Sequence, residues 1–112
     1  DGQTIASAYQ DGTVKQWRVS DGREMNVFTG HKGAVYSVNF SPGGKILASS
    51  SYDNSVKLWR LENPLRRVLR GHTAEVNSIR FSPNGQQLVS ASQDGSIKLW
   101  DVNGRFLSTI AS

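Results

Sequence analysis

The chain has 112 residues, of which 37% are hydrophobic and 9% aromatic, with no cysteine and a formal net charge of +4. This apolar content suffices for a packed core and argues against disorder. The lack of cysteine excludes disulfides, a thiolate nucleophile and a zinc–cysteine site. No apolar run is long enough to span a membrane, and the first residues show no secretory signal. We therefore expect a cytoplasmic protein without a membrane partner.

The excess positive charge lies in the second half of the chain, mostly between Lys57 and Arg70. Such a patch could bind nucleic acid or an acidic protein. Aromatic side chains do not alternate with these charges, although proteins that bind single strands usually stack bases on them. We interpret the patch as a solvated strand face, which leaves nucleic-acid binding as the disfavoured alternative.

Short strands are predicted along the whole chain, because apolar residues either run together briefly or alternate with polar ones. In chain order they cover residues 4–8, 13–19, 24–29, 34–40, 46–50, 55–61, 65–70, 75–81, 87–91, 96–102 and 106–110. No segment keeps a helical period with caps. The chain is therefore expected to be all-β.

Turn residues separate these strands. Asp11-Gly12, Asp53-Asn54 and Asp94-Gly95 tolerate a positive φ, so each is expected to form a tight hairpin. Pro42-Gly43-Gly44 and Pro83-Asn84-Gly85 place proline where its fixed φ suits the second position of a turn.

The strand at residues 34–40 has apolar side chains on both faces, since Val35 differs in parity from Val38 and Phe40. This pattern indicates a strand packed between two neighbouring sheets, or a strand with a bulge.

A repeat of about 41 residues organises these elements. Gly30-His31 recurs 41 residues later as Gly71-His72, and Trp59 recurs at the same spacing as Trp100. Periods of about 20 to 50 residues indicate solenoids, propellers or arrays. Because the repeating unit consists of strands, a propeller is favoured.

The repeated residues resemble the WD-repeat family of β-propellers. Each full copy has a Gly-His pair, a serine in its second strand, an aspartate in the following turn and a tryptophan in its third strand. The dipeptide that names the family is present as Trp100-Asp101, whereas the other copies read Trp17-Arg18 and Trp59-Arg60. The resemblance implies four-stranded antiparallel sheets that pack as propeller blades.

About three blades are predicted, over residues 1–29, 30–70 and 71–112. The first has neither the Gly-His pair nor the first strand. Because a closed propeller has about four to eight blades, we expect a partial propeller. It would belong to a larger one, or complete a ring with further copies of itself.

Each histidine is expected to lie near an aspartate and a serine of its own repeat, which are also the components of a hydrolase triad. The set is duplicated, however, and no Gly-x-Ser-x-Gly elbow is present, so catalysis is disfavoured. The resemblance implies instead a buried hydrogen-bond chain in which each polar group has a partner. Its expected members are His31, Ser49, Asp53 and Trp59 in the second blade, and His72, Ser90, Asp94 and Trp100 in the third.

In the first blade, Ser7, Asp11 and Trp17 occupy the equivalent positions without a histidine. Another segment or chain would have to supply one, or the trio stays open. No metal or cofactor is expected, because the two histidines belong to different blades and the glycine-rich turns lack the Lys-Ser/Thr of a phosphate loop. The repeated lysines of the third strands are expected to point outward, at Lys15, Lys57 and Lys98.

The resemblance also implies a rim with three partner-binding positions per blade: two near the start of the first strand and one before the turn aspartate. They are Ala34, Tyr36 and Tyr52 in the second blade, Glu75, Asn77 and Gln93 in the third, and Gln10 in the first. Two tyrosines in one blade favour a binding surface, since tyrosine is enriched at hot spots. Alternatively, both cover strand ends or lie between blades.

The expected function is a non-catalytic scaffold for protein–protein interaction. Its expected partners are other propeller blades and a protein or peptide ligand on the rim. The alternative is a propeller segment of an enzyme-linked or nucleic-acid-binding protein that uses the basic stretch Lys57–Arg70.

Overall fold

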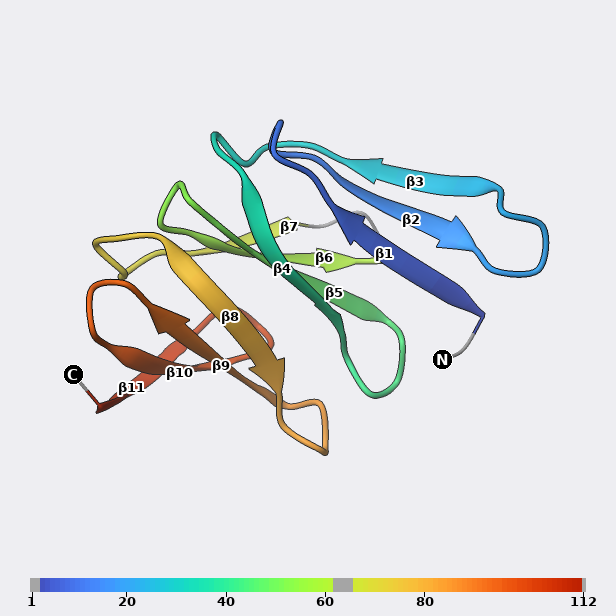
Figure 1. Cartoon of the computed structure of the whole chain (residues 1–112). Helices are drawn as coiled ribbons and strands as arrows, with labels where there is room; N and C mark the ends of the chain where they lie inside the picture. The colour runs from blue at the N-terminus through green and yellow to red at the C-terminus, as the bar shows by residue number, and fades with distance from the viewer. Residues whose placement is uncertain (1–2, 62–65, 112) are drawn as a thin grey trace.

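The computed structural model describes residues 3–61 and 66–111 of the chain (Figure 1). Every regular element within these residues is a β-strand, which confirms the all-β prediction. The described part therefore has no helix long and apolar enough to cross a membrane.

The strands form three antiparallel sheets in which neighbours in sequence are neighbours in space. The first sheet contains β1 (Thr4–Ala8), β2 (Val14–Arg18) and β3 (Glu24–Phe28). The second contains β4 (Val35–Phe40), β5 (Ile46–Ser51), β6 (Val56–Arg60) and β7 (Arg66–Leu69). The third contains β8 (Val76–Phe81), β9 (Gln87–Ser92), β10 (Ile97–Asp101) and β11 (Phe106–Ala111).

These sheets have the architecture of propeller blades. Observed strand ends differ from the predicted ones by no more than one residue, although the predicted start at Leu65 lies outside the described residues. Ends of this kind are the least certain part of a sequence-based assignment.

Bulges explain the apolar residues on both faces of the first strands. The β4–β5 register shifts between Val35 and Ser37, and the β8–β9 register shifts between Val76 and Ser78. The extra residue bends the strand and changes which side its neighbours face. Of the two explanations offered for this pattern, the bulge is therefore observed.

The hairpin turns use the expected residues. Asn54 has φ of 73°, and Gly12 at the equivalent place in the first sheet has φ of 90°. Gly12 is also needed for close packing, because a Cβ there would lie 2.5 Å from the carbonyl oxygen of His31. This turn of the first sheet thus presses against the loop that precedes β4.

Two apolar cores join the three sheets. Between the first and second sheets, Val14 packs with Leu47 and Trp59. Between the second and third, the core includes Leu58 and Trp100. Because both faces of the second sheet are covered, β5 and β6 are buried along almost their whole length.

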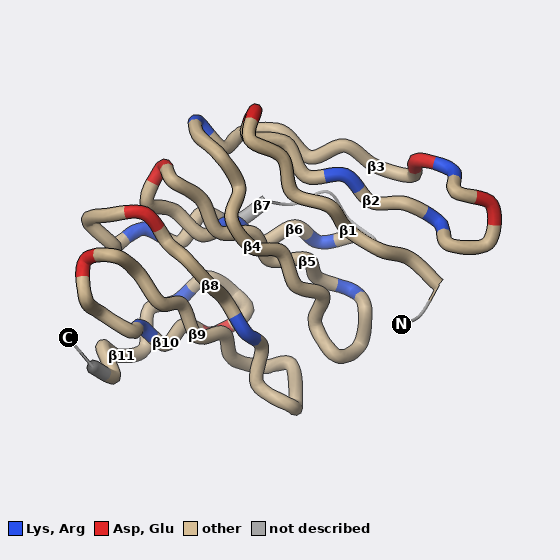
Figure 2. Tube along the Cα trace, in the orientation of Figure 1, with Lys and Arg blue, Asp and Glu red and all other residues tan. Residues whose placement is uncertain are grey.

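The strands at the inner edge of the arc are β1, β4 and β8, and β4 contacts both of the others. Figure 2 shows long uncharged stretches along β1, β4 and β5. Charged residues lie in the turns and on β2, β3, β6, β7, β8 and β10. The inner edge is therefore mostly uncharged.

Candidate functional site

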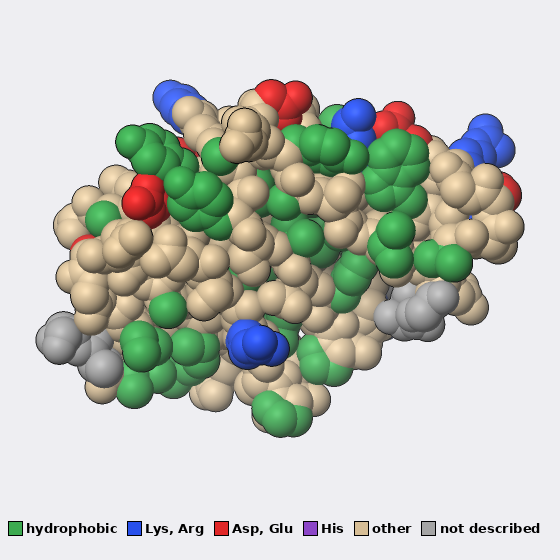
Figure 3. Space-filling view, in the orientation of Figure 1, with side chains coloured by type: hydrophobic (Ala, Val, Ile, Leu, Met, Phe, Trp, Pro, Cys, Tyr) green, Lys and Arg blue, Asp and Glu red, His purple; other side chains and the backbone are tan. Residues whose placement is uncertain are grey.

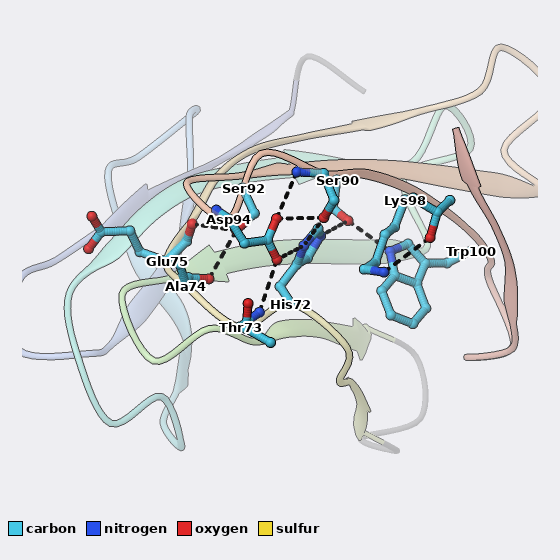
Figure 4. A network of polar contacts seen from close by, with 11 residues as sticks. His72, Thr73, Ala74, Glu75, Ser90, Ser92, Asp94, Lys98 and Trp100 are labelled. Atoms are coloured by element: carbon cyan, nitrogen blue, oxygen red, sulfur yellow. Dashed lines mark hydrogen bonds and ion pairs between the residues drawn. The ribbon is translucent and has the colours of Figure 1, made fainter. Parts of the chain in front are cut away.

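The third blade contains a continuous chain of hydrogen bonds, shown in Figure 4. His72 Nδ1 lies 3.1 Å from Asp94 Oδ2, and His72 Nε2 lies 2.7 Å from Ser90 Oγ. The indole N–H of Trp100 donates to the same Ser90 oxygen at 2.8 Å. These hydrogen bonds therefore run from the turn after β9, through the loop before β8 and strand β9, to the end of β10.

The second blade repeats this geometry. His31 Nδ1 lies 3.1 Å from Asp53 Oδ2, and His31 Nε2 lies 2.6 Å from Ser49 Oγ. The indole of Trp59 donates to Ser49 Oγ at 3.0 Å. The structure thus brings together all four residues expected in each of these blades.

The pKa values of Asp53 and His31 fix the direction of the hydrogen bonds in the second blade. Burial works to raise the pKa of Asp53, but hydrogen bonds from Ser55, the Lys32 N–H and His31 outweigh it and lower the pKa to about 2. The ionised carboxylate requires His31 to donate through Nδ1, so Nε2 accepts from the Ser49 hydroxyl. Burial also lowers the pKa of His31, which keeps the imidazole neutral.

The aspartate holds two segments together. In the third blade, Asp94 accepts hydrogen bonds from the Thr73 N–H at 2.9 Å and from the Ser96 N–H at 2.8 Å. It therefore fastens the loop before β8 to the turn between β9 and β10. Hydrogen bonds to a charged acceptor are stronger than neutral ones.

Sequence reasoning missed the serine two residues after each aspartate. Ser55 and Ser96 donate their hydroxyls to Asp53 and Asp94. The signal was present, because Asp-x-Ser/Thr occurs at the same place in all copies, including Asp11-Gly12-Thr13.

Two other serines donate to backbone carbonyls and are not part of the hydrogen-bond chain. Ser51, two residues after Ser49, donates to the carbonyl of Ala34 at 2.9 Å. Ser92 donates to the carbonyl of Glu75 at 3.0 Å. Ser49 and Ser90, rather than these two serines, therefore meet the histidines.

The first sheet contains only part of this hydrogen-bond chain. Trp17 donates to Ser7 Oγ at 2.9 Å, and the Ser7 hydroxyl lies 3.0 Å from the hydroxyl of Tyr9. Asp11 instead accepts hydrogen bonds from the Thr13 N–H at 3.0 Å and the Thr13 hydroxyl at 2.7 Å. The structure thus brings Ser7 and Trp17 together and leaves Asp11 apart.

The buried chain is poorly suited to hydrolysis. Ser49 and Ser90 are fully buried, and each oxygen contacts both an imidazole and an indole. A nucleophilic serine has to reach a substrate carbonyl and needs donors aimed at the developing oxyanion. Within the described residues, no group of three potential metal-ligating side chains occurs.

The expectation that Lys57 points outward is wrong. Lys57 is only 5% exposed, because its face of β6 packs toward the first sheet. Lys15 and Lys98 are half-buried; Lys15 pairs with Glu24 at 3.6 Å, and Lys98 donates to Thr109 at 3.1 Å.

The basic stretch Lys57–Arg70 is also not one solvated face. Lys57 is buried, whereas Arg60 is half-buried and donates to Asn103 at 3.2 Å. Arg70 is exposed. The side chains of Arg66 and Arg67 lie outside the described structure.

The expected rim residues lie at one end of the second and third sheets. Tyr36 and Tyr52 are 45% and 60% exposed, and their rings meet edge to face with centroids 6.5 Å apart. The Tyr36 hydroxyl donates to Glu75 at 3.4 Å. Figure 3 shows hydrophobic side chains beside an acidic one where β5 turns toward β6.

The remaining rim positions differ in exposure. Gln10, Asn77 and Gln93 are exposed, while Ala34 and Glu75 are half-buried. Tyr36 occupies the bulge of β4, which directs its ring away from the core. Partial burial and the nearby carboxylate of Glu75 raise the pKa of Tyr36, so its hydroxyl stays protonated.

Meandering sheets packed face to face, with a repeated Asp–His–Ser–Trp chain, define this protein as a segment of a β-propeller. The family model described as "WD domain, G-beta repeat" matches residues 1–18, 22–60 and 63–101. The chain therefore belongs to the WD-repeat family.

The family matches are out of phase with the sheets. Strand β3 falls in the second match although it pairs with β2, and β7 falls in the third although it pairs with β6. Each sequence repeat thus includes the outer strand of one sheet and the inner strands of the next. This arrangement links neighbouring sheets covalently.

The curated relatives include "Eukaryotic translation initiation factor 3 subunit I" from Aspergillus niger, which is 39% identical over 62 residues. The protein of the same name from Neurospora crassa is 32% identical over 62 residues. The alignments cover 55% of this chain and 18% of each relative. The chain thus matches less than a fifth of the length of these relatives.

Proposed function

We propose that this protein is a non-catalytic WD-repeat scaffold that holds a protein or peptide partner on the rim of its second blade. The exposed pair Tyr36 and Tyr52 carries this proposal. Such side chains offer a large contact area at a low cost in conformational entropy, and they are enriched at binding hot spots. The contact between Tyr36 and Glu75 supports a prearranged surface.

Further blades are the second proposed class of partner. The outer sheets expose several large apolar side chains: Ile5, Val19 and Val27 in the first, and Phe106, Leu107 and Ile110 in the third. Exposed apolar surface of this kind is typical of interfaces. Its location on the end sheets supports packing against further blades, either of a longer chain or of a second copy.

The names of the relatives support a role within a larger assembly, since each is named as a subunit of an initiation factor. The proposed partner is therefore another protein subunit. The cytoplasmic location stays a prediction.

The nucleic-acid alternative needs a continuous exposed basic face, which the described residues of the basic stretch do not form. Lys57 is buried, and Arg60 already has an amide partner. Phosphate-dominated binding requires several accessible cations and depends steeply on salt.

Tyr52→Ala tests the rim proposal. Removing a hot-spot aromatic typically costs about 2 kcal/mol of binding free energy or more. Binding to purified subunits of initiation factor 3 should weaken at least tenfold in surface plasmon resonance, while the melting temperature barely changes. Gln93→Ala, at the equivalent position of the third blade, should have a smaller effect. Unchanged affinity in both Tyr52→Ala and Tyr36→Ala would contradict the proposal.

A further inference from the structure

A small cavity of about 90 Å³ lies beside the hydrogen-bond chain of the second blade. It forms where the loop before β4 meets the turn between β5 and β6. The described residues that line it are Gly30, Lys32, Asp53, Ser55, Lys57 and Arg70. Three cationic residues and one acidic residue are therefore among the described residues that line this space.

The carboxylate is engaged within its own blade. Asp53 Oδ2 accepts from His31 at 3.1 Å and from the Lys32 N–H at 2.9 Å. Its Oδ1 accepts from the N–H of Ser55 at 3.0 Å and from the Ser55 hydroxyl. Asp53 is thus held by its own blade, and its hydrogen-bonding capacity is largely used.

Burial strengthens the positive potential of the cavity. Lys57 is 5% exposed, so water screens its ammonium less than it would on the surface. Its charge also acts on His31: burial lowers the pKa of that imidazole, and the charge of Lys57 lowers it further.

The cationic set is specific to the second blade. Forty-one residues later in the sequence, Thr73 matches Lys32 and Ala111 matches Arg70. In the sheet, Ala111 pairs with Ile97 as Leu69 pairs with Val56, so the third blade has no cation at either place. Only the strand lysine is kept, as Lys98. The third blade forms the same hydrogen-bond chain without the additional cations, so the blade fold does not require them.

We propose that the cavity between Lys32, Lys57 and Arg70 binds a phosphoryl or sulfate group. Cations converging on a small space suit a compact oxyanion. The space is small, so it suits one such compact group rather than a nucleotide. The group is either a free anion or one carried by a partner.

The cavity lies close to the rim, because its lining residue Asp53 directly follows Tyr52 in the chain. Lys32 precedes Gly33, where an added Cβ would lie 3.3 Å from the Cβ of Tyr52. A partner bound at Tyr52 could therefore place a phosphorylated side chain over Lys32. This second source rests on the proposed rim function, whereas binding of a free anion does not.

Calorimetric titration of the full chain with inorganic phosphate, at constant ionic strength, tests the site. The double variant Lys32→Thr/Arg70→Ala gives the second blade the residues of the third, and it should weaken binding at least tenfold. A matched control, Lys45→Thr/Arg105→Ala, removes the same charges from exposed positions and should leave binding unchanged. Melting curves check that both variants fold.

Titration with O-phosphoserine separates the two sources. Tighter binding than inorganic phosphate, with no binding of serine, supports a group carried by a partner. Equal binding of the two phosphates supports a free anion. Absence of binding by either probe, or equal binding by the parent and the Lys32→Thr/Arg70→Ala variant, overturns the site. None of these outcomes depends on the effect of Tyr52→Ala.

Discussion

All three sheets contain a hydrogen bond from a tryptophan to a serine. The next partner of the serine differs between the first sheet and the other two. In the third, the Ser90 oxygen meets His72, which leads on to Asp94. In the first, the Ser7 oxygen instead meets the hydroxyl of Tyr9 at 3.0 Å. A tyrosine hydroxyl can satisfy the serine, but it does not reach the turn aspartate.

This difference separates two tasks of the hydrogen-bond chain. The Trp–Ser contact joins neighbouring strands within a sheet, and it forms in all three sheets. The His–Asp contact attaches the loop that leads into the inner strand of the same sheet. The tryptophan is more deeply buried where the His–Asp contact is present. Trp59 and Trp100 are buried, whereas Trp17 is half-buried. The histidine and the aspartate thus join sheet and loop together.

The largest expected difference between the sheets comes from removing tryptophan. Trp100 packs against Phe106 with ring centroids 5.4 Å apart, and a Cβ on Gly71 would come within 3.3 Å of its ring. Trp100→Ala should cost about 3–5 kcal/mol, the usual range for a buried aromatic. Trp17→Ala should cost clearly less, as measured by urea unfolding. Equal losses would show that the first sheet depends on its tryptophan as much as the third.

Removal of a histidine should have the next largest effect. His72→Ala leaves Ser90 and Asp94 without their imidazole partner, and a buried polar group left unsatisfied costs about 1–3 kcal/mol. His31→Ala should do the same in the second blade. Differential scanning calorimetry at fixed protein concentration measures both effects.

The first sheet supplies the control for the histidine variants. Tyr9→Phe removes one hydroxyl from a half-buried contact, so its loss should stay near about 1 kcal/mol or less. If the histidine variants melt like the parent and an esterase activity disappears with them, the structural role is wrong and the triad interpretation returns.

The sequence predicted the strands and turns well because their signals are local. Asn54 takes the positive φ that its side chain tolerates, and alternating residues identified β6 and β10. The hydrogen-bond partners of His31 and His72 followed from the repeat, since equivalent residues in equivalent blades meet equivalent neighbours.

What the sequence did not predict depends on contacts between sheets. Alternation placed Lys57 on one face of its strand, but it could not show that this face is covered by another sheet. The role of Tyr9 was equally hidden, because a serine stands at the equivalent position in the other copies and bonds to the backbone. The local sequence pattern predicts on which face of a strand a side chain lies, whereas the packing of the sheets decides what that face contacts.

The pH dependence of stability should show the smallest difference between the sheets. Burial holds the pKa of His31 below its ordinary 6.5, against the opposing effect of Asp53. As the pH falls from about 7 to 5, the unfolded chain takes up this proton before the folded one, so stability decreases. Asp53, with a pKa of about 2, stays ionised in this range, and its contribution is lost only between about pH 4 and 2. In urea unfolding, His31→Gln should therefore lose less stability than the parent from pH 7 to 5, and Tyr9→Phe should follow the parent. A parent-like loss in His31→Gln would show that the neutral histidine does not set this dependence.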